Sequence, residues 1–339
     1  MTTEAEVRQS LDGILVPGPV RSLVKMNLVR EVAITDQKVK VTLAAAALGT
    51  GTRDWVRDKV NQVVKELPGV KEAETDFVEA KPQDVNEIGN VVAVMSGKGG
   101  VGKSLISGLL GICLARQDHD VGILDADITG PSIPMMFGVS VRPTGGETGI
   151  MPVTTKTGIE MMSINLLLPH EDDAVVWRGP LIGKAITQFW EEVAWGKLDY
   201  LVVDLPPGTA DAPLTVMQSL PVSGAVVVFS PQELAAMVVR KAVQMCQKME
   251  IPIIGVVENM SYLILPEDGR RIDVFGPSKA QDMAEAAQAP LLLQLPIDPE
   301  LARLCDKGEI ERYDSALVTE FGRAFVEAIS KRGRVKKAS

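Results

Sequence analysis

The chain has 339 residues, a formal net charge of −9, 46% hydrophobic residues and 23% charged residues. This length predicts one large or two smaller domains with a substantial core, and the acidic balance argues against a general nucleic-acid-binding surface. The three cysteines have no paired spacing, which indicates a reducing cytoplasm. No apolar run is long enough to span a membrane, and the polar N-terminal segment lacks a signal-peptide core.

Residues 1–80 are predicted to form a small α+β unit. Apolar residues recur at helical spacing in one stretch, and other stretches are short and rich in β-branched residues. The expected elements are helices over Glu4–Ile14 and Arg53–Leu67 and strands over Leu28–Thr35, Lys38–Ala44 and Val70–Phe77. The next segment is polar and contains proline, so a linker is expected over 81–89.

Residues 90–335 are predicted to form an α/β domain, because apolar strand patterns alternate with helical ones. The expected architecture is a mostly parallel sheet with helices on both faces. The expected strands are Asn90–Met95, Val121–Asp125, Leu201–Asp204, Ala225–Ser230, Ile253–Asn259 and Leu291–Leu295. The expected helices are Leu105–Ala115, Leu181–Val193, Gln232–Met249, Lys279–Gln288 and Ser315–Lys331.

The loop between the first strand and the first helix of this domain carries the pattern G-x-x-x-x-G-K-S. Its glycines allow backbone N–H groups to converge on phosphate oxygens, and the helix N-terminus adds partial positive charge. Lys103 is expected to neutralise the β- and γ-phosphates, and Ser104 to hold Mg²⁺. The expected phosphate-binding residues are Gly97, Lys98, Gly99, Gly100, Val101, Gly102, Lys103 and Ser104.

Two other interpretations fit the letters of this loop. A chance match is disfavoured by the flanking strand and helix. The same glycines also fit the dinucleotide fingerprint G-x-G-x-x-G, with acids downstream at Asp125 and Asp127. A dinucleotide loop has no use for a lysine aimed at a terminal phosphate, so Lys103 and Ser104 favour a nucleoside triphosphate.

Acidic residues end two further strands of the predicted sheet, where ligands of such sheets bind. Asp204 ends an apolar strand and fits a carboxylate that orders the Mg²⁺ shell. Either Asp125 or Asp127 fits a residue that positions the attacking water, and Gly208 can offer an amide to the γ-phosphate. A lone strand-end Asp is more often a helix N-cap, but three acids beside a phosphate loop favour catalysis.

Several motifs along residues 90–330 together resemble one family. They are Ser96–Ser104 (SGKGGVGKS), Leu124–Pro134 (LDADITGPSIP), Trp177–Lys184 (WRGPLIGK), Asp204–Asp211 (DLPPGTAD), Val257–Tyr262 (VENMSY) and Leu295–Pro299 (LPIDP). The chain resembles the Mrp/ApbC family of P-loop ATPases, which is related to MinD, ParA and nitrogenase iron protein. Residues 1–80 resemble, more weakly, the small iron–sulfur assembly domain that precedes many bacterial members.

The resemblance implies a homodimer that closes around two ATP molecules and hydrolyses them slowly. It implies that Lys98 reaches the partner subunit's nucleotide, although a solvated loop lysine is the simpler alternative. It further implies that Asp127 orients the attacking water and that Asn259 recognises the adenine edge. The implied catalytic residues are Lys98, Lys103 and Asp127. The implied nucleotide-binding residues are those of the loop together with Leu105, Gly208, Asn259 and Pro296. The implied Mg²⁺-binding residues are Ser104, Asp125 and Asp204.

Cysteines are missing where the family has them. Members usually carry C-x-x-C after the NMSY stretch, and two such cysteines per subunit would ligate a shared iron–sulfur cluster. Here Leu265 and Asp268 stand at those positions, and Ala44–Thr52 lacks the cysteine of the N-terminal domain. The remaining cysteines, Cys113, Cys246 and Cys305, fall in or near apolar helical patterns. No iron–sulfur ligand is therefore expected. Leu105 replaces a usual threonine near the α-phosphate.

Two smaller features were also interpreted. His119 and His170 are far apart in the sequence and indicate no zinc site. The last helix carries Leu317, Phe321, Phe325 and Ile329 at four-residue spacing, followed by the basic tail Lys331–Lys337. Both a membrane-tethering helix and a closing helix of the domain fit this pattern, and Glu320 and Glu327 favour the closing helix.

Three functional hypotheses follow. The first is a cytoplasmic, homodimeric ATPase that carries or assembles iron–sulfur clusters and meets apo-protein clients. The second is an ATP-gated switch for a protein partner that has lost cluster ligation. The third, least favoured, is a MinD/ParA-like spatial organiser. The intact nucleotide motifs serve all of them, and the missing cysteines move weight toward the second.

Overall fold

The central element is an eight-stranded sheet with the order β10-β11-β7-β12-β6-β13-β14-β17. The computed structural model describes residues 2–127, 130, 132–167, 179–232 and 235–336. The strands are β6 Glu87–Ser96, β7 Val121–Asp125, β10 Val153–Thr154, β11 Glu160–Ser163, β12 Lys197–Asp204, β13 Gly224–Phe229, β14 Ile253–Glu258 and β17 Leu291–Gln294. Every neighbouring pair is parallel except β10 with β11. The predicted α/β class with a mostly parallel sheet is confirmed.

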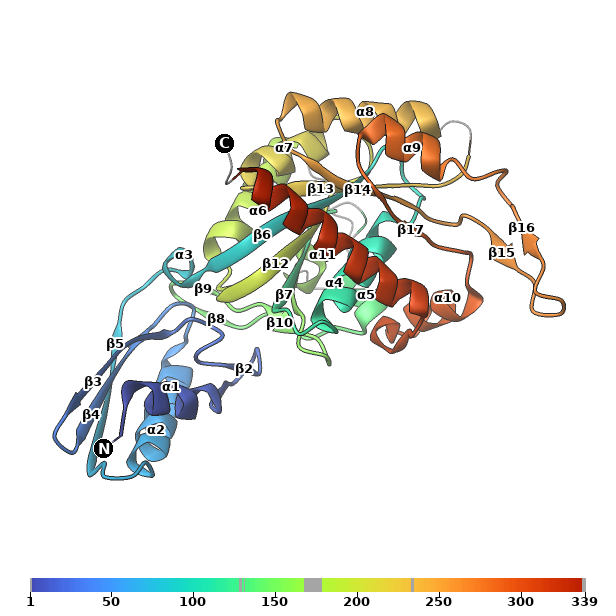
Figure 1. Cartoon of the computed structure of the whole chain (residues 1–339). Coiled ribbons are helices and arrows are strands. Elements are labelled where there is room, and N and C mark those ends of the chain that lie inside the picture. The colour runs from blue at the N-terminus through green and yellow to red at the C-terminus, as the bar shows by residue number, and fades with distance from the viewer. Residues whose placement is uncertain (1, 128–129, 131, 168–178, 233–234, 337–339) are drawn as a thin grey trace.

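Helices cover both faces of this sheet (Figure 1). The bounds are α4 Lys103–Ala115, α5 Ile133–Phe137, α6 Gly179–Glu192, α7 Asp211–Ser219, α8 Ala235–Lys248, α9 Ala280–Ala287, α10 Pro299–Asp306 and α11 Ala316–Lys336, with 3₁₀ turns η1 Ile164–Leu167 and η2 Ile310–Arg312. One core cluster lies under α6, α7, α8 and α9, and the other under α4, α5, α10 and α11. In α11, Phe321 and Phe325 are fully buried, which supports the closing-helix interpretation.

The N-terminal unit packs two helices on a three-stranded sheet of order β3-β4-β5. Its elements are α1 Glu4–Asp12, β1 Leu15–Val16, β2 Arg21–Ser22, β3 Val29–Thr35, β4 Lys38–Ala44, α2 Thr50–Lys65 and β5 Glu72–Val78. The pair β3–β4 is antiparallel and β4–β5 is parallel. Met151 and Ala194 from the larger part of the chain join its core, so the two parts share packed apolar surface.

The expected linker over 81–89 instead contains ordered elements. The short helix α3 spans Pro82–Val85, and β6 begins at Glu87. Pro82 starts the helix, where a missing N–H costs nothing, and Val85 is fully buried. The Asn86 side chain donates to the Val193 carbonyl at 2.9 Å. Polar composition suggested a linker, but long-range contacts fix this segment.

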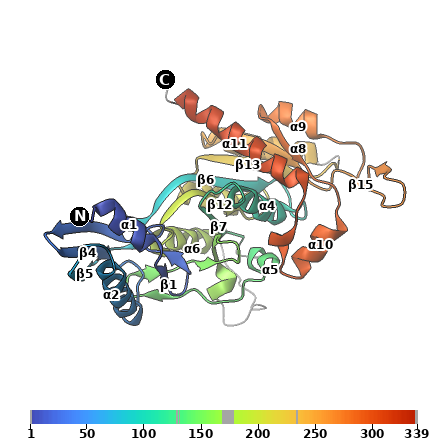
Figure 2. The same ribbon diagram turned by 60° about the horizontal axis from the view of Figure 1, so that its bottom comes forward.

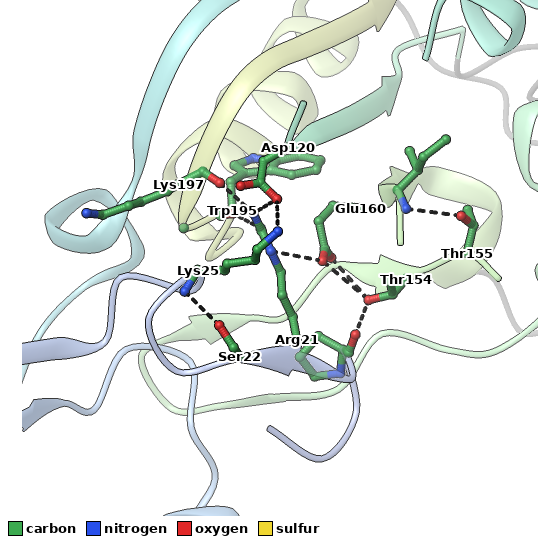
Figure 3. Close-up of polar contacts among 12 residues, drawn as sticks. Arg21, Ser22, Lys25, Asp120, Thr154, Thr155, Glu160, Trp195 and Lys197 are labelled. Atoms are coloured by element: carbon green, nitrogen blue, oxygen red, sulfur yellow. Dashed lines mark hydrogen bonds and ion pairs between the residues drawn. The ribbon is translucent and has the colours of Figure 1, made fainter. Parts of the chain in front are cut away.

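Arg21 joins the N-terminal unit to the amino edge of the large sheet (Figure 3). Its guanidinium donates to the Trp195 carbonyl at 2.9 Å and to the Lys197 carbonyl, and its Nε lies 3.6 Å from Glu160 Oε1. Arg21 is 8% exposed and Glu160 is 1% exposed. A buried guanidinium is stable only with such partners, so these contacts fix the docking. Burial raises the pKa of Glu160 to about 8, against the opposing effect of Arg21.

Two hairpins complete the described part of the chain. They are β8 Gly145–Gly146 with β9 Gly149–Ile150, and β15 Leu263–Ile264 with β16 Arg271–Ile272. The β15–β16 hairpin projects from the end of the molecule opposite the N-terminal unit (Figures 1 and 2). No helix in the described ranges is long and apolar enough to cross a membrane. His170, Trp177 and Arg178, named in the sequence interpretation, lie outside these ranges.

Candidate functional site

The glycine loop joins β6 to α4 at the carboxyl edge of the large sheet. Gly100 and Gly102 have φ values of 77° and 78°, in the left-handed region that favours glycine. A Cβ on Gly102 would lie 2.1 Å from Nδ2 of Asn259. Gly102 is also the N-cap of α4, so the helix N-terminus with its partial positive charge opens at the loop. Leu105 is half-buried and packs against the core under α4.

Lys103 lies buried among acidic side chains. Its Nζ is 2.8 Å from Asp204 Oδ2 and 3.6 Å from Asp127 Oδ2, and the side chain is 5% exposed. Ser104 donates through Oγ to the same Asp204 oxygen at 2.5 Å. The structure therefore brings together the lysine, the hydroxyl and two of the three acids that the sequence predicted. The buried ammonium group of Lys103 pairs with carboxylates here, and it is positioned to pair with phosphate oxygens in their place.

Asp125 is the third acid, and it lies beside Asp204 on the neighbouring strand. Burial, together with the nearby carboxylate of Asp204, raises the pKa of Asp125 to about 8. Its Oδ1 accepts from the Asp127 N–H at 3.2 Å. Its Oδ2 accepts from the Ile133 N–H at 3.3 Å and from Ser163 Oγ at 3.2 Å. Asp125 thus anchors the chain that follows β7 and the end of β11.

Lys98 and Gly208 both contact Ser96 at the start of the loop. Lys98 Nζ donates to the side-chain oxygen of Gln232 in the same chain, and its carbonyl accepts from Ser96 Oγ at 2.9 Å. The Gly208 N–H donates to the Ser96 carbonyl at 3.0 Å. The structure therefore places both residues at the loop, each with an intramolecular partner.

Asn259 and Pro296 follow β14 and β17 at the same edge of the sheet. Asn259 is 3% exposed, and its Nδ2 donates to the Val101 carbonyl at 2.9 Å. Pro296 is half-buried and follows Leu295, whose carbonyl accepts from the Ser261 N–H at 2.9 Å. Asn259 therefore contacts the phosphate loop directly, and Pro296 lies next to the chain segment that carries Asn259.

Several polar residues of this site were not predicted. Ser107 is fully buried and donates to Asp204 Oδ1 at 2.6 Å, so two serines of α4 hold one carboxylate. Its spacing of three residues after Ser104 on a helix was an available signal. Ser163, Gln232 and Ser230 carried no local signal. Ser230 Oγ is buried and has no hydrogen-bond partner within the described part of the chain.

The three cysteines lie on three different helices. Cys113 and Cys246 are buried on α4 and α8, and Cys305 on α10 is half-buried. Burial raises the pKa of both Cys113 and Cys246 to about 12 and that of Cys305 to about 11, so all three favour the thiol. Across the described ranges, no group of three or more His, Cys, Asp or Glu side chains is arranged to hold a metal ion.

The fold and this site define the class of protein. A parallel sheet, a glycine loop that caps the following helix and a buried lysine beside strand-end acids are the parts of a P-loop NTPase. A dinucleotide-binding loop would have no role for a lysine that lies among acidic side chains, as Lys103 does, so the dinucleotide interpretation is disfavoured.

Comparisons with known proteins agree with this class and identify the family. Residues 87–330 match a family model described as NUBPL iron-transfer P-loop NTPase, and residues 4–75 match one described as iron-sulfur cluster assembly protein. The iron-sulfur cluster carrier protein of Aquifex aeolicus is 39% identical over 302 residues, covering 80% of this chain and 83% of the relative. That of Synechocystis sp. is 38% identical over 321 residues, covering 91% and 90%. The chain belongs to the iron-sulfur cluster carrier family of P-loop NTPases, as the resemblance to Mrp/ApbC proteins indicated.

Solved structures agree with the fold. A nucleotide-binding protein from Archaeoglobus fulgidus in complex with ADP is 45% identical, with a TM-score of 0.62 over 69% of this chain and 94% of that chain. The MinD cell division protein of Aquifex aeolicus is 20% identical, with a TM-score of 0.50 over 70% of this chain and 97% of that chain. The second likeness shows the fold alone.

Proposed function

We propose that this chain binds ATP with Mg²⁺ at Gly97–Ser104 and hydrolyses it slowly as a homodimer. The observation that carries the proposal is the buried Lys103, 2.8 Å from Asp204 at the N-terminus of α4, with the Ser104 hydroxyl on the same carboxylate. The glycines of the loop fit a phosphate chain, because a side chain at Gly102 would collide with Asn259. The ADP complex of the Archaeoglobus relative supports nucleotide at this fold.

Each charged group at the site has a task in this reaction. Mg²⁺ would be held by Ser104, with Asp204 and Asp125 ordering its shell, and when bound it neutralises charge on the phosphate oxygens. Lys103 neutralises the β- and γ-phosphates. Asp127 orients a water whose oxygen attacks the γ-phosphorus while the bond to the ADP oxygen breaks, and one proton of that water passes to the released phosphate. Lys98 of one subunit stabilises charge on the nucleotide of the other, as an arginine finger does.

The amide and loop groups complete the proposed binding site. Gly208 offers its N–H to the γ-phosphate once the contact with Ser96 opens, and Asn259 and Pro296 border the adenine. Water is positioned only in the closed dimer, so turnover of the wild type is slow.

The residues present do not fit an iron–sulfur cargo held as the resemblance implies. A [4Fe–4S] centre shared by two subunits needs about two thiolates from each. At those positions this chain offers Leu265 and Asp268 near the tip of the β15–β16 hairpin, and leucine cannot ligate iron. The three cysteines lie on separate helices as poorly ionised thiols. We therefore favour an ATP-gated switch that acts on a protein partner of iron–sulfur assembly over a carrier that ligates the cluster itself.

The nucleotide assignment is tested by Lys103→Ala. Removing the cation that faces the β- and γ-phosphates should weaken ATP affinity about ten- to a hundredfold, since a charge-assisted contact contributes roughly 1.5–3 kcal/mol. Isothermal titration calorimetry with Mg²⁺ and ATP measures the change. Lys241→Ala, an exposed lysine on α8, is the matched control and should bind as the wild type does. Wild-type affinity in Lys103→Ala would exclude this site.

A further inference from the structure

Glu258, the last residue of β14, is a fully buried carboxylate with a complete set of hydrogen-bond donors. Its Oε2 accepts from Ser261 Oγ at 2.5 Å, from Ser278 Oγ at 2.7 Å and from Gln294 Nε2 at 3.0 Å. Its Oε1 accepts from the Lys279 N–H at 2.7 Å. A carboxylate away from water is stable only when its oxygens are paired in this way. The proposed ATP chemistry assigns no task to Glu258.

These donors stand at the two ends of a projecting segment, residues 262–277, which we call the arm. Ser261 precedes the arm and Ser278 follows it, so one carboxylate holds both ends. The arm contains the β15–β16 hairpin, whose strands have two residues each, and it extends away from the sheet (Figure 1). A two-stranded hairpin is marginally stable by itself. The direction of the arm therefore depends on how its ends are held.

The arm also exposes apolar side chains. Ile264 is 50% exposed, Val274 is 48% exposed, and Ile272 and Phe275 are each 37% exposed. Large apolar side chains that remain in water on a projecting segment are typical of a surface that contacts another molecule. A change in the position of the arm would therefore change its contact with that other molecule.

The residue after Glu258 touches the phosphate loop. Asn259 donates through Nδ2 to the Val101 carbonyl, and its backbone N–H donates to the Phe229 carbonyl at 2.8 Å. Met260 follows with a φ of 53°, a conformation that costs a non-glycine residue about 1 kcal/mol or more. The next residue, Ser261, is bonded to Glu258. One short turn thus contacts the phosphate loop with one side chain and the start of the arm with another.

We propose that Glu258 is a positioning residue that fixes the arm relative to the nucleotide loop, so that ATP binding at Gly97–Ser104 changes the order of the arm. The inference rests on the proposed ATP site. ATP that orders Val101 and its neighbours also restrains Asn259, and the Glu258 carboxylate carries that restraint to both ends of the arm. Two sites that share one rigid anchor are coupled, and such coupling commonly amounts to 5- to 150-fold, roughly, in an equilibrium constant.

Glu258→Gln tests the anchor because it preserves shape and removes an acceptor. Glutamine presents one oxygen and an NH₂ group to donors that now meet two oxygens, so at least one donor loses its partner. Hydrogen exchange of the arm amides is measured in the full chain, without nucleotide and with saturating ATP and Mg²⁺. In the wild type, ATP should slow arm exchange at least about fivefold. In Glu258→Gln, nucleotide-free arm exchange should accelerate about tenfold, and the response to ATP should disappear.

Two further variants separate positioning from general stability. Glu267→Gln changes an exposed carboxylate on the arm itself and should keep the wild-type ATP response. The double variant Glu258→Gln/Gln294→Glu returns a carboxylate to the same cluster, because Gln294 Nε2 already lies 2.7 Å from Ser278 Oγ and 3.4 Å from Ser261 Oγ. It should restore the ATP response of the arm. A loss of stability alone would instead accelerate exchange in β12 as well, and equally with and without ATP.

The outcomes are distinct. An arm that responds to ATP in Glu258→Gln as it does in the wild type, or a double variant that behaves like the single one, overturns the inference. Failure of the wild type to bind ATP in calorimetry overturns the proposed function instead. In that case the nucleotide-free comparison still tests whether Glu258 holds the arm. Hydrogen exchange of the arm that is unchanged in Glu258→Gln would contradict this role, and faster exchange would support it.

Discussion

At the scale of single residues, the site is organised around the charge of Lys103. The ammonium group lies between Asp204 and Asp127, and its burial makes these contacts stronger than they would be in water. The Ser104 hydroxyl donates to the same Asp204 oxygen that Lys103 contacts, and the Ser107 hydroxyl donates to the other oxygen. The site thus has its donors and acceptors in place before nucleotide arrives, which reduces the reorganisation needed for phosphoryl transfer.

Asp127→Asn tests the proposed catalytic acid. The substitution preserves shape and removes the charge that orients water, so ATP should still bind while hydrolysis slows about a hundredfold or more. Calorimetry measures binding, and phosphate release measures turnover. Glu309→Gln, at a partly exposed ion pair with Arg312 outside the site, is the control and should hydrolyse at the wild-type rate. Unchanged hydrolysis in Asp127→Asn would show that another group positions the water.

The sequence predicted the members of this site better than their contacts. Lys103, Ser104 and Asp204 follow from a loop motif and from an apolar strand that ends in an acid. The bonds of Ser163 to Asp125 and of Gln232 to Lys98 join residues 38 and 134 positions apart. Nothing local marks such partners, because the sheet order that brings them together is a property of the whole fold.

At the scale of elements, the junction between β6 and α4 depends on glycine. Gly102 has a left-handed φ of 78°, and Asn259 fills the space where a side chain would be. In contrast, Gly51 lies in the first turn of α2, and a Cβ there meets nothing within 4 Å. These two glycines therefore respond to alanine in opposite ways.

Gly102→Ala should destabilise the fold by about 2 kcal/mol, from left-handed strain and the lost Asn259–Val101 hydrogen bond. Gly51→Ala should be neutral or stabilise by up to about 1 kcal/mol, since alanine is the better helix former. Urea unfolding measures both. Equal effects of the two substitutions would contradict the described loop geometry. ATP affinity should fall in Gly102→Ala only.

Apolar β-branched strands were predictable, and the strand β11 was not. The runs at Asn90–Met95 and Val121–Asp125 are apolar and bounded by turn residues, and they appear as β6 and β7. The strand β11 spans only Glu160–Ser163, with the sequence EMMS and all four residues buried. Its pattern lacks both alternation and β-branched residues, so the edge of the sheet was visible only in the structure.

At the scale of the molecule, the N-terminal unit is docked against the amino edge of the large sheet, opposite the edge that carries the phosphate loop. Arg21 is satisfied by carbonyls of Trp195 and Lys197, and Lys25 adds an exposed ion pair with Asp120 at 2.9 Å. A Cβ on Gly196 would lie 2.7 Å from the Lys25 carbonyl oxygen, so the two parts approach closely. These contacts favour a fixed domain over a loosely tethered one.

This docking should depend on pH through Glu160. Burial raises the pKa of Glu160 to about 8 from its ordinary value of 4.5, so the folded state binds the proton more tightly than the unfolded chain. The stability contribution is therefore greatest below about pH 4.5, falls as the pH rises, and levels off above about pH 8. The Thr154 hydroxyl donates to the Pro19 carbonyl and to Glu160 Oε2 at 3.3 Å, and its donation to the carboxylate lowers the pKa of Glu160 against the larger effect of burial.

Glu160→Gln removes this titration and gives the measurement. The unfolding free energy of the wild type relative to Glu160→Gln should decline between pH 5.5 and pH 8.5 in urea titrations. Arg21→Met removes the charge that opposes this shift, so it should raise the pKa of Glu160 further and extend the decline to higher pH. A difference between wild type and Glu160→Gln that is constant over this range, or that rises with pH, would contradict the assignment.

The chain belongs to the iron-sulfur cluster carrier family, and we propose that it is gated by ATP and that its own cysteines do not hold a cluster. Anaerobic reconstitution with iron and sulfide, followed by desalting and by iron and absorbance measurements, tests this most directly. We predict no stoichiometric iron and no thiolate-to-iron absorption bands, with ATP binding intact in the same sample. A stoichiometric centre that absorbs in those bands and is lost when Cys113, Cys246 or Cys305 is replaced by serine would contradict the account and restore the carrier hypothesis.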